Sequence, residues 1–140
     1  MPDIRGNDTA LQEILTQAKY IAVVGHSAKP SRPSYQIAQF LRRQGYQVYP
    51  VNPGLKSIEG YPCYASLHQA PPPIDIVNVF RRSEYLPEIV EAAIAIGAKT
   101  LWTQLGVADQ ASAQTVIDAG LNVIMDACIK IEHLRLCSKN

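Results

Sequence analysis

The segment after the apolar run Tyr20 to Val24 gathers side chains suited to holding a phosphate. Gly25 permits a tight turn that a ligand can approach closely, and Ser27 adds a hydroxyl group. Lys29 and Arg32 supply positive charge, and a helix predicted to begin just after them would direct its N-terminal amides to the same place. Polar surface loops have a similar composition, but the position between a strand and a helix favours an anion site.

A second candidate segment follows a later strand and lacks the acid of a dinucleotide site. Only Gly25 of the three glycines of the GxGxxG fingerprint is present, and no Asp or Glu ends the strand near Val51, so the sequence disfavours NAD. Val51 and Pro53 offer apolar surface to a base, Asn52 can hydrogen-bond, and Lys56 suits an adenosine with a ribose phosphate. A stiff turn bounded by prolines explains these residues equally well.

No catalytic set stands out in the sequence. Cys128 precedes the last predicted helix, whose N-terminus favours a reactive thiolate, but packing in the core is the favoured interpretation. His68 and His133 have no partners at metal-ligand spacing, and His26 beside Ser27 lacks an orienting acid. We therefore expect no catalytic residue and no metal site, and assign no chemistry to His26.

The composition is that of an ordinary globular chain of 140 residues, of which 47% are apolar. The 13 basic and 12 acidic residues leave a net charge of +1, too balanced for general attraction to nucleic acid or an anionic membrane. The polar start Met1 to Asn7 predicts no signal peptide, and the apolar runs fall far short of the roughly 20 residues that span a bilayer. Since the three cysteines are scattered, we expect reduced thiols and a cytoplasmic protein.

Strand and helix signals alternate along the chain, which is typical of a parallel α/β sheet. The expected strands are short apolar runs at residues 20–24, 47–51, 74–80, 100–103 and 121–125. The expected helices begin at caps Asp8 and Ser34 and at residues 84, 109 and 129, and the second and fourth end at Gly45 and Gly120. Residues 50–73 are rich in proline and read as loop, with a short helix at 65–68.

These elements predict one Rossmann-like domain over residues 1–140, a five-stranded, doubly wound parallel sheet in three layers. The expected strand order is 3-2-1-4-5, which places a ligand where the order reverses, between the first and fourth strands. The loops at the carboxyl ends of the strands would surround that ligand: 25–34, 50–56, 80–83, 103–107 and 126–129.

Several of these loops carry motifs that together resemble a known family. They are Val51-Asn52-Pro53, Phe80-Arg81, the WxQxG segment from Trp102 to Gly106, and Cys128 followed by Glu132 and His133. In this order, through nearly the whole chain, the sequence resembles the small stand-alone CoA-binding domain family, related to the CoA-binding amino-terminal domain of the succinyl-CoA ligase alpha subunit. The family usually has a basic residue before this cysteine, where the chain has Ala127.

The resemblance implies where coenzyme A would lie. Its pyrophosphate would rest on the turn from Gly25 to Lys29, its adenosine near Val51 to Pro53, and Phe80 and Arg81 would flank the nucleotide. Taken with the loop residues above, the predicted cofactor-binding set is Gly25, Ser27, Lys29, Arg32, Val51, Asn52, Pro53, Lys56, Phe80, Arg81, Gln104 and Gly106.

The predicted function is non-catalytic binding of coenzyme A or an acyl-CoA, with a homodimer or a partner enzyme left open. The ligase transfers acyl groups through a phosphorylated histidine in a second domain, and 140 residues are too few to contain that domain. An NAD(P)-binding redox protein or regulator is the alternative. A protein-interaction scaffold is the third reading, which leaves the basic loop at Lys29 unexplained.

Overall fold

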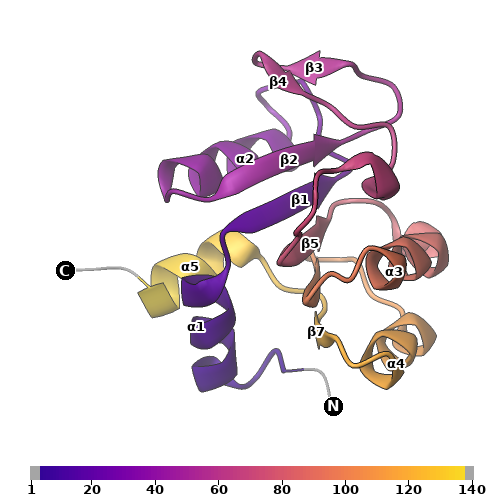
Figure 1. Ribbon diagram of the computed structural model, residues 1–140. Coiled ribbons are helices and arrows are strands. Elements are labelled where there is room, and N and C mark those ends of the chain that lie inside the picture. The colour runs from indigo at the N-terminus through magenta and orange to yellow at the C-terminus, as the bar shows by residue number, and fades with distance from the viewer. Residues whose placement is uncertain (1–3, 138–140) are drawn as a thin grey trace.

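A computed structural model describes residues 4–137 as a parallel sheet between two layers of helices (Figure 1). The five strands are β1 (Tyr20–Val24), β2 (Gln47–Val51), β5 (Ile76–Val79), β6 (Thr100–Thr103) and β7 (Asn122–Ile124). All neighbouring strands of this sheet pair in parallel. The predicted Rossmann-like, five-stranded α/β fold is confirmed.

Each face of the sheet is covered by its own helices. Helices α1 (Asp8–Gln17), α2 (Pro33–Arg43) and α5 (Ile129–Cys137) pack on one face, around the fully buried Trp102. Helices α3 (Leu86–Ala95) and α4 (Gln110–Asp118) cover the other. Because both faces are buried, the strands are apolar runs rather than alternating ones. No helix within residues 4–137 is long and apolar enough to cross a membrane.

The strand order is β2-β1-β5-β6-β7, so the predicted 3-2-1-4-5 order is wrong. The third predicted strand, residues 76–79, lies beside β1 instead of beside β2. The place beside β2 is taken by Tyr64, whose N–H donates to the Pro50 carbonyl at 2.9 Å in a single parallel bridge. Pro50 has no N–H to donate toward this side, which limits the pairing. The order therefore reverses between β1 and β5, not between the first and fourth strands.

The connection from β2 to β5 crosses the edge of the sheet without a full helix. It contains the two-stranded hairpin β3 (Ser57–Ile58) and β4 (Tyr61–Pro62), and then the short 3-10 helix η1 (Leu67–Gln69). The short helix predicted at 65–68 is thus present, shifted by one or two residues. Leu67 of η1 is buried in the same core cluster as Leu86 and Ile89, so the segment around η1 packs against α3.

Two predicted helix caps are wrong. Asn7 caps α1, because its side chain accepts a hydrogen bond from the Ala10 N–H, while Asp8 pairs with Arg135 at 2.9 Å. Helix α2 begins at Pro33, which puts Ser34 inside its first turn. The helix predicted to begin at residue 84 divides into a 3-10 turn, η2 (Ser83–Tyr85), and α3.

Candidate functional site

The turns after β1 and β5 lie against each other at the carboxyl edge of the sheet. Gly25 has a φ of 88°, which a residue with a side chain rarely adopts. A Cβ atom built on Gly25 would lie 3.3 Å from the Phe80 carbonyl carbon and 3.1 Å from Cδ of Arg81. Glycine is therefore required here both by conformation and by contact.

Hydrogen bonds hold the turn after Gly25 in a fixed shape. The Ser27 N–H donates to Oγ of Ser34 at 2.9 Å, and the Lys29 N–H donates to Oγ of Ser27 at 3.0 Å. The Arg32 N–H donates to the Lys29 carbonyl at 3.0 Å. Ser34 thus does not cap α2 but fastens the turn in front of it, so the turn is preformed.

Asn52 ties the loop after β2 to this turn. Its Nδ2 donates to the His26 carbonyl at 3.0 Å, and its Oδ1 accepts from the Gly54 N–H at 2.9 Å. Both ends of the amide are thus engaged within the protein. The predicted hydrogen bond from Asn52 to an adenosine stays a prediction, and the contacts make Asn52 a support for the loops as well.

One cleft, which we call the α2 cleft, opens between the first turn of α2 and the loop after β6. Its volume is about 440 Å³. It combines cations and hydroxyls on the α2 side with an amide and apolar groups on the β6 side. Its lining includes the predicted Gly25, Ser27, Lys29, Arg32, Phe80 and Gln104, together with Pro33, Ser34, Leu105 and Val107.

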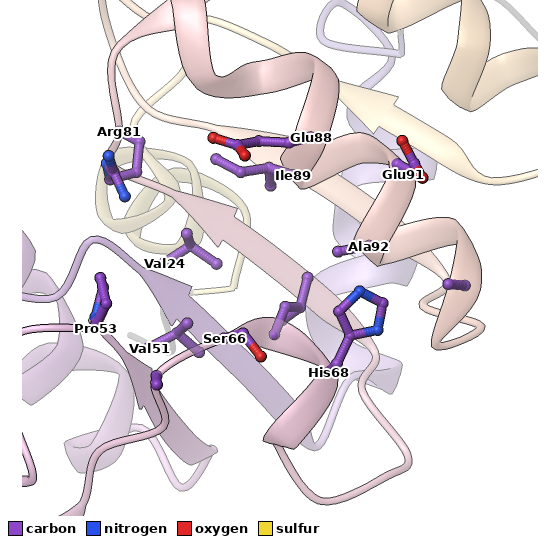
Figure 2. A pocket seen from close by; sticks show the side chains of 13 residues that line it. Val24, Val51, Pro53, Ser66, His68, Arg81, Glu88, Ile89, Glu91 and Ala92 are labelled. Carbon is purple, nitrogen blue, oxygen red and sulfur yellow. The ribbon is translucent and has the colours of Figure 1, made fainter.

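A second cleft, the α3 cleft, opens on the other side of the same edge (Figure 2) and has a volume of about 500 Å³. Val24, Val51 and Ile89 give it apolar walls, and the predicted Pro53 and Arg81 also line it. The two clefts flank the same two turns, since Val24 precedes Gly25 and Phe80 precedes Arg81 in the chain.

Polar residues that the sequence analysis did not select line the α3 cleft. Ser66 and His68 come from the segment around η1, and Glu88 and Glu91 come from α3 (Figure 2). No local motif marks them, because only the folding of the β2 to β5 connection against α3 brings them together. Their two carboxylates give this cleft an acidic side.

Arg81 is held by an aromatic contact. Its guanidinium carbon lies 4.0 Å from the centroid of the Tyr85 ring, a cation–π geometry. The neighbouring Arg82 forms an exposed ion pair with Glu84 at 3.3 Å. Of the two arginines, only Arg81 lines one of the two clefts, and its contact with a nucleotide stays a prediction.

Three of the predicted residues, Asn52, Lys56 and Gly106, line neither cleft. Lys56 is exposed on the loop before β3. Gly106 has a φ of 83°, and its N–H donates to Oδ1 of Asp126 at 2.7 Å, so it shapes the loop between β6 and α4. The structure thus gathers nine of the twelve predicted residues in the linings of the two clefts and leaves these three outside them.

Gln104 and Cys128 are notable for their burial. Oε1 of Gln104 is buried without a hydrogen-bond partner among the described residues. Cys128 is also buried, immediately before α5, and packs in the core on the α2 face. Packing therefore accounts for Cys128. Within residues 4–137, no group of three His, Cys, Asp or Glu side chains could hold a metal ion.

Comparisons with known proteins agree on one family. The family model described as "CoA binding domain" matches residues 19–134. The Bacillus subtilis (strain 168) protein YneT is 42% identical over 123 residues, which cover 88% of this chain and 91% of YneT. Acetate–CoA ligase [ADP-forming] I of Archaeoglobus fulgidus is 33% identical over 79 residues, covering 56% of this chain but only 12% of the ligase. A solved hypothetical protein from Pyrococcus horikoshii OT3 has a TM-score of 0.93 at 37% identity, covering 99% of this chain and 98% of that one.

Proposed function

Because this chain belongs to the CoA-binding domain family, we propose that it is a non-catalytic module that holds coenzyme A or an acyl-CoA across the two clefts. The whole chain, residues 1–140, would form this one domain. The observation that carries the proposal is the preformed turn from Gly25 to Arg32, which meets the N-terminus of α2 where the strand order reverses.

The pyrophosphate fits the α2 cleft. Lys29 and Arg32 are exposed there and supply positive charge, and Ser27 adds a hydroxyl group. The first turn of α2 adds backbone N–H groups and the positive end of the helix dipole. The fixed turn needs little ordering when an anion binds, which favours affinity.

The adenosine fits the α3 cleft, whose apolar walls Val24, Val51 and Ile89 suit the face of a base. Its acidic side, Glu88 and Glu91, would repel a phosphate. The ribose phosphate of coenzyme A would therefore point away from α3, toward the solvent near Lys56.

The pantetheine arm fits the β6 side of the α2 cleft. The buried Oε1 of Gln104 needs a hydrogen-bond donor, and a phosphate offers only acceptors at neutral pH. Pantetheine has two amide N–H groups that could fill this role. Val107 and the exposed Leu105 would then contact its apolar parts or an acyl group.

We expect the chemistry to take place on a partner enzyme or not at all. Cys128 is packed in the core and is not available as a nucleophile. The match covers only 12% of the ligase, so most of the ligase lies outside the region that resembles this chain. Incubation of the purified protein with acetate, ATP and coenzyme A should therefore yield no acetyl-CoA. A homodimer is the other arrangement that the proposal leaves open.

Ligand identity tests the proposal directly. Mass spectrometry of ligand released from the purified protein should find coenzyme A or an acyl-CoA, and calorimetry should show that coenzyme A binds more tightly than NAD. Dephospho-CoA should bind more weakly than coenzyme A by about 1 to 3 kcal/mol if a cation contacts the ribose phosphate. Released NAD, or tighter binding of NAD, would contradict the proposal and favour a redox protein or regulator.

A further inference from the structure

His26 belongs to the turn from Gly25 to Lys29, but it lines neither cleft. The side chain is fully buried, with 0% exposed, and its ring meets the Tyr35 ring edge-on at 6.2 Å. Its Nδ1 lies 2.8 Å from the carbonyl oxygen of Ser27. A carbonyl can only accept, so Nδ1 carries the hydrogen and Nε2 of the neutral ring has none.

We propose that His26 is a positioning residue, whose neutral imidazole holds the turn from Gly25 to Lys29 in the shape that receives an anion. The expected effect of His26 on the affinity for coenzyme A rests on the proposed function. By fixing the Ser27 carbonyl toward the interior, His26 also fixes the plane of the next peptide bond, whose N–H points the opposite way. A released carbonyl would be free to turn toward the cleft, where its oxygen would repel a phosphate.

His26 also connects the turn to the loop after β2, because its own carbonyl accepts from Nδ2 of Asn52 at 3.0 Å. Ser27 is thus held at three points: its carbonyl by His26, its N–H by Ser34 and its hydroxyl by the Lys29 N–H. Of these three contacts, only the one from His26 comes from a side chain that titrates near neutral pH.

The surroundings of His26 favour its neutral form. From α2, Tyr35 and Arg42 face it; Glu59, at the tip of the β3–β4 hairpin, accepts a hydrogen bond from the Tyr35 hydroxyl at 2.5 Å. The Arg42 guanidinium lies 4.0 Å above the Tyr61 ring and makes no ion pair with a carboxylate of the described residues. Protonation of His26 would add a buried cation near the half-buried Arg42.

Protonation would also leave Nε2–H without an acceptor, because Nε2 is buried and has no partner among the described residues. Burial lowers the pKa of His26 below its ordinary 6.5, Arg42 lowers it further, and the bond to Ser27 opposes them. The imidazole is therefore neutral at neutral pH. Protonation at Nε2 would leave the bond from Nδ1 to Ser27 intact, but it would place a charge and an unpaired N–H in a buried site beside Arg42. Acid that forces this protonation should drive the ring out of its site and so loosen the turn.

Two substitutions of His26 distinguish the role of its hydrogen bond to Ser27 from the role of its volume in the core. His26→Leu fills the site without a donor, whereas the amide nitrogen of His26→Asn can take the place of Nδ1 and does not titrate. By calorimetry at neutral pH, His26→Leu should bind coenzyme A about tenfold more weakly than wild type, the size of one hydrogen bond of ordinary strength, and His26→Asn should recover most of this loss. The control His133→Asn removes a histidine that packs on Phe40 and Tyr46, away from both clefts, and should bind as wild type does.

The pH profile is the readout that a purely structural role would not move. Between about pH 5 and 8, wild type should lose more affinity on acidification than His26→Asn does. Taking the difference between the two proteins cancels the titration of the ribose phosphate of coenzyme A itself, whose second pKa is about 6. Equal profiles for the two proteins, or a folded His26→Leu with wild-type affinity, would overturn the proposal.

A measurement without ligand distinguishes this inference from the proposed function. In NMR spectra of the free protein, the amide signals of Ser27 and Lys29 should titrate together with His26 in wild type and stay constant in His26→Asn. If coenzyme A fails to bind wild type while these signals titrate, the proposed function is wrong and His26 still positions the turn. If the signals do not follow His26, the positioning role is wrong, whichever ligand binds. The titration of wild type alone decides this, so the result does not depend on a variant that might misfold.

Discussion

Substitution of Gly25 by alanine tests whether the close contact of the β1 and β5 turns builds the site. A positive φ costs a residue with a Cβ atom about 1 to 2 kcal/mol. The new Cβ would also lie 3.3 Å from the Phe80 carbonyl carbon, and Phe80 cannot easily retreat because its N–H donates to the Val24 carbonyl at 2.8 Å. Crowding of this kind adds about 1 kcal/mol or more. We therefore expect Gly25→Ala to lower the free energy of unfolding by about 2 to 3 kcal/mol.

Gly25→Ala should weaken the binding of coenzyme A more than it lowers stability. The reason is that the new Cβ also lies 3.1 Å from Cδ of Arg81, which lines the α3 cleft. That side chain can move, but only by shifting its guanidinium from the Tyr85 ring into or out of the α3 cleft. Gly97→Ala is the matched control: its φ is 72°, and nothing lies within 4 Å of the added Cβ. Urea unfolding should show a loss of about 1 to 2 kcal/mol for Gly97→Ala, and calorimetry should show unchanged affinity for coenzyme A. Gly25→Val should abolish binding in a domain that circular dichroism shows to be folded; normal binding by either folded Gly25 variant would refute the reasoning.

Two further predictions concern charge. Lys29→Ala should weaken binding of coenzyme A and reduce its dependence on salt, because an exposed phosphate contact is screened over about 8 to 10 Å in ordinary buffer, whereas Lys19→Ala at the opposite edge should change neither; calorimetry at two salt concentrations decides. Burial acts to raise the pKa of Asp75, but hydrogen bonds from the N–H groups of Lys19 and Tyr20, with Lys99 at 3.4 Å, lower it overall. The stabilisation from this carboxylate is present above its unfolded pKa and is lost as pH falls through the lower folded value. Urea titrations should therefore show that acid below about pH 4 destabilises wild type more than Asp75→Asn, and equal acid sensitivity would contradict this assignment.

The sequence predicted the strands well because each is a short apolar run whose ends are marked by polar or turn-forming residues. Ile76 to Val79 is buried at every position, as a strand covered on both faces must be. Their order was predicted wrongly because alternation of strands and helices does not say on which side of β1 the next strand is added. One local signal was available: Pro50 lacks the N–H that a longer partner on the outer side of β2 would need.

The two clefts differ in how far the sequence could predict them. The α2 cleft takes much of its lining from one stretch, Gly25 to Ser34, so a turn motif suffices to find it. The α3 cleft is assembled from the segment around η1 and from one side of α3, which are about 20 residues apart in sequence, a separation well beyond the reach of local patterns. Glu88 and Glu91 look like an ordinary solvated helix face until the 66–68 segment lies opposite them.

Polar residues beside a turn can contact the ligand or support the turn, and composition does not separate these uses. Ser34 and Asn52 were assigned by type, as a helix cap and as a contact to adenosine, yet both bond to the backbone of the turn after Gly25. Backbone amides bind an anion well only when they are aimed before it arrives, since aiming them afterward costs conformational entropy. The side chains that fix the turn from behind therefore contribute to affinity without touching the ligand, and His26, the most buried of them, is the one whose contribution can change with pH.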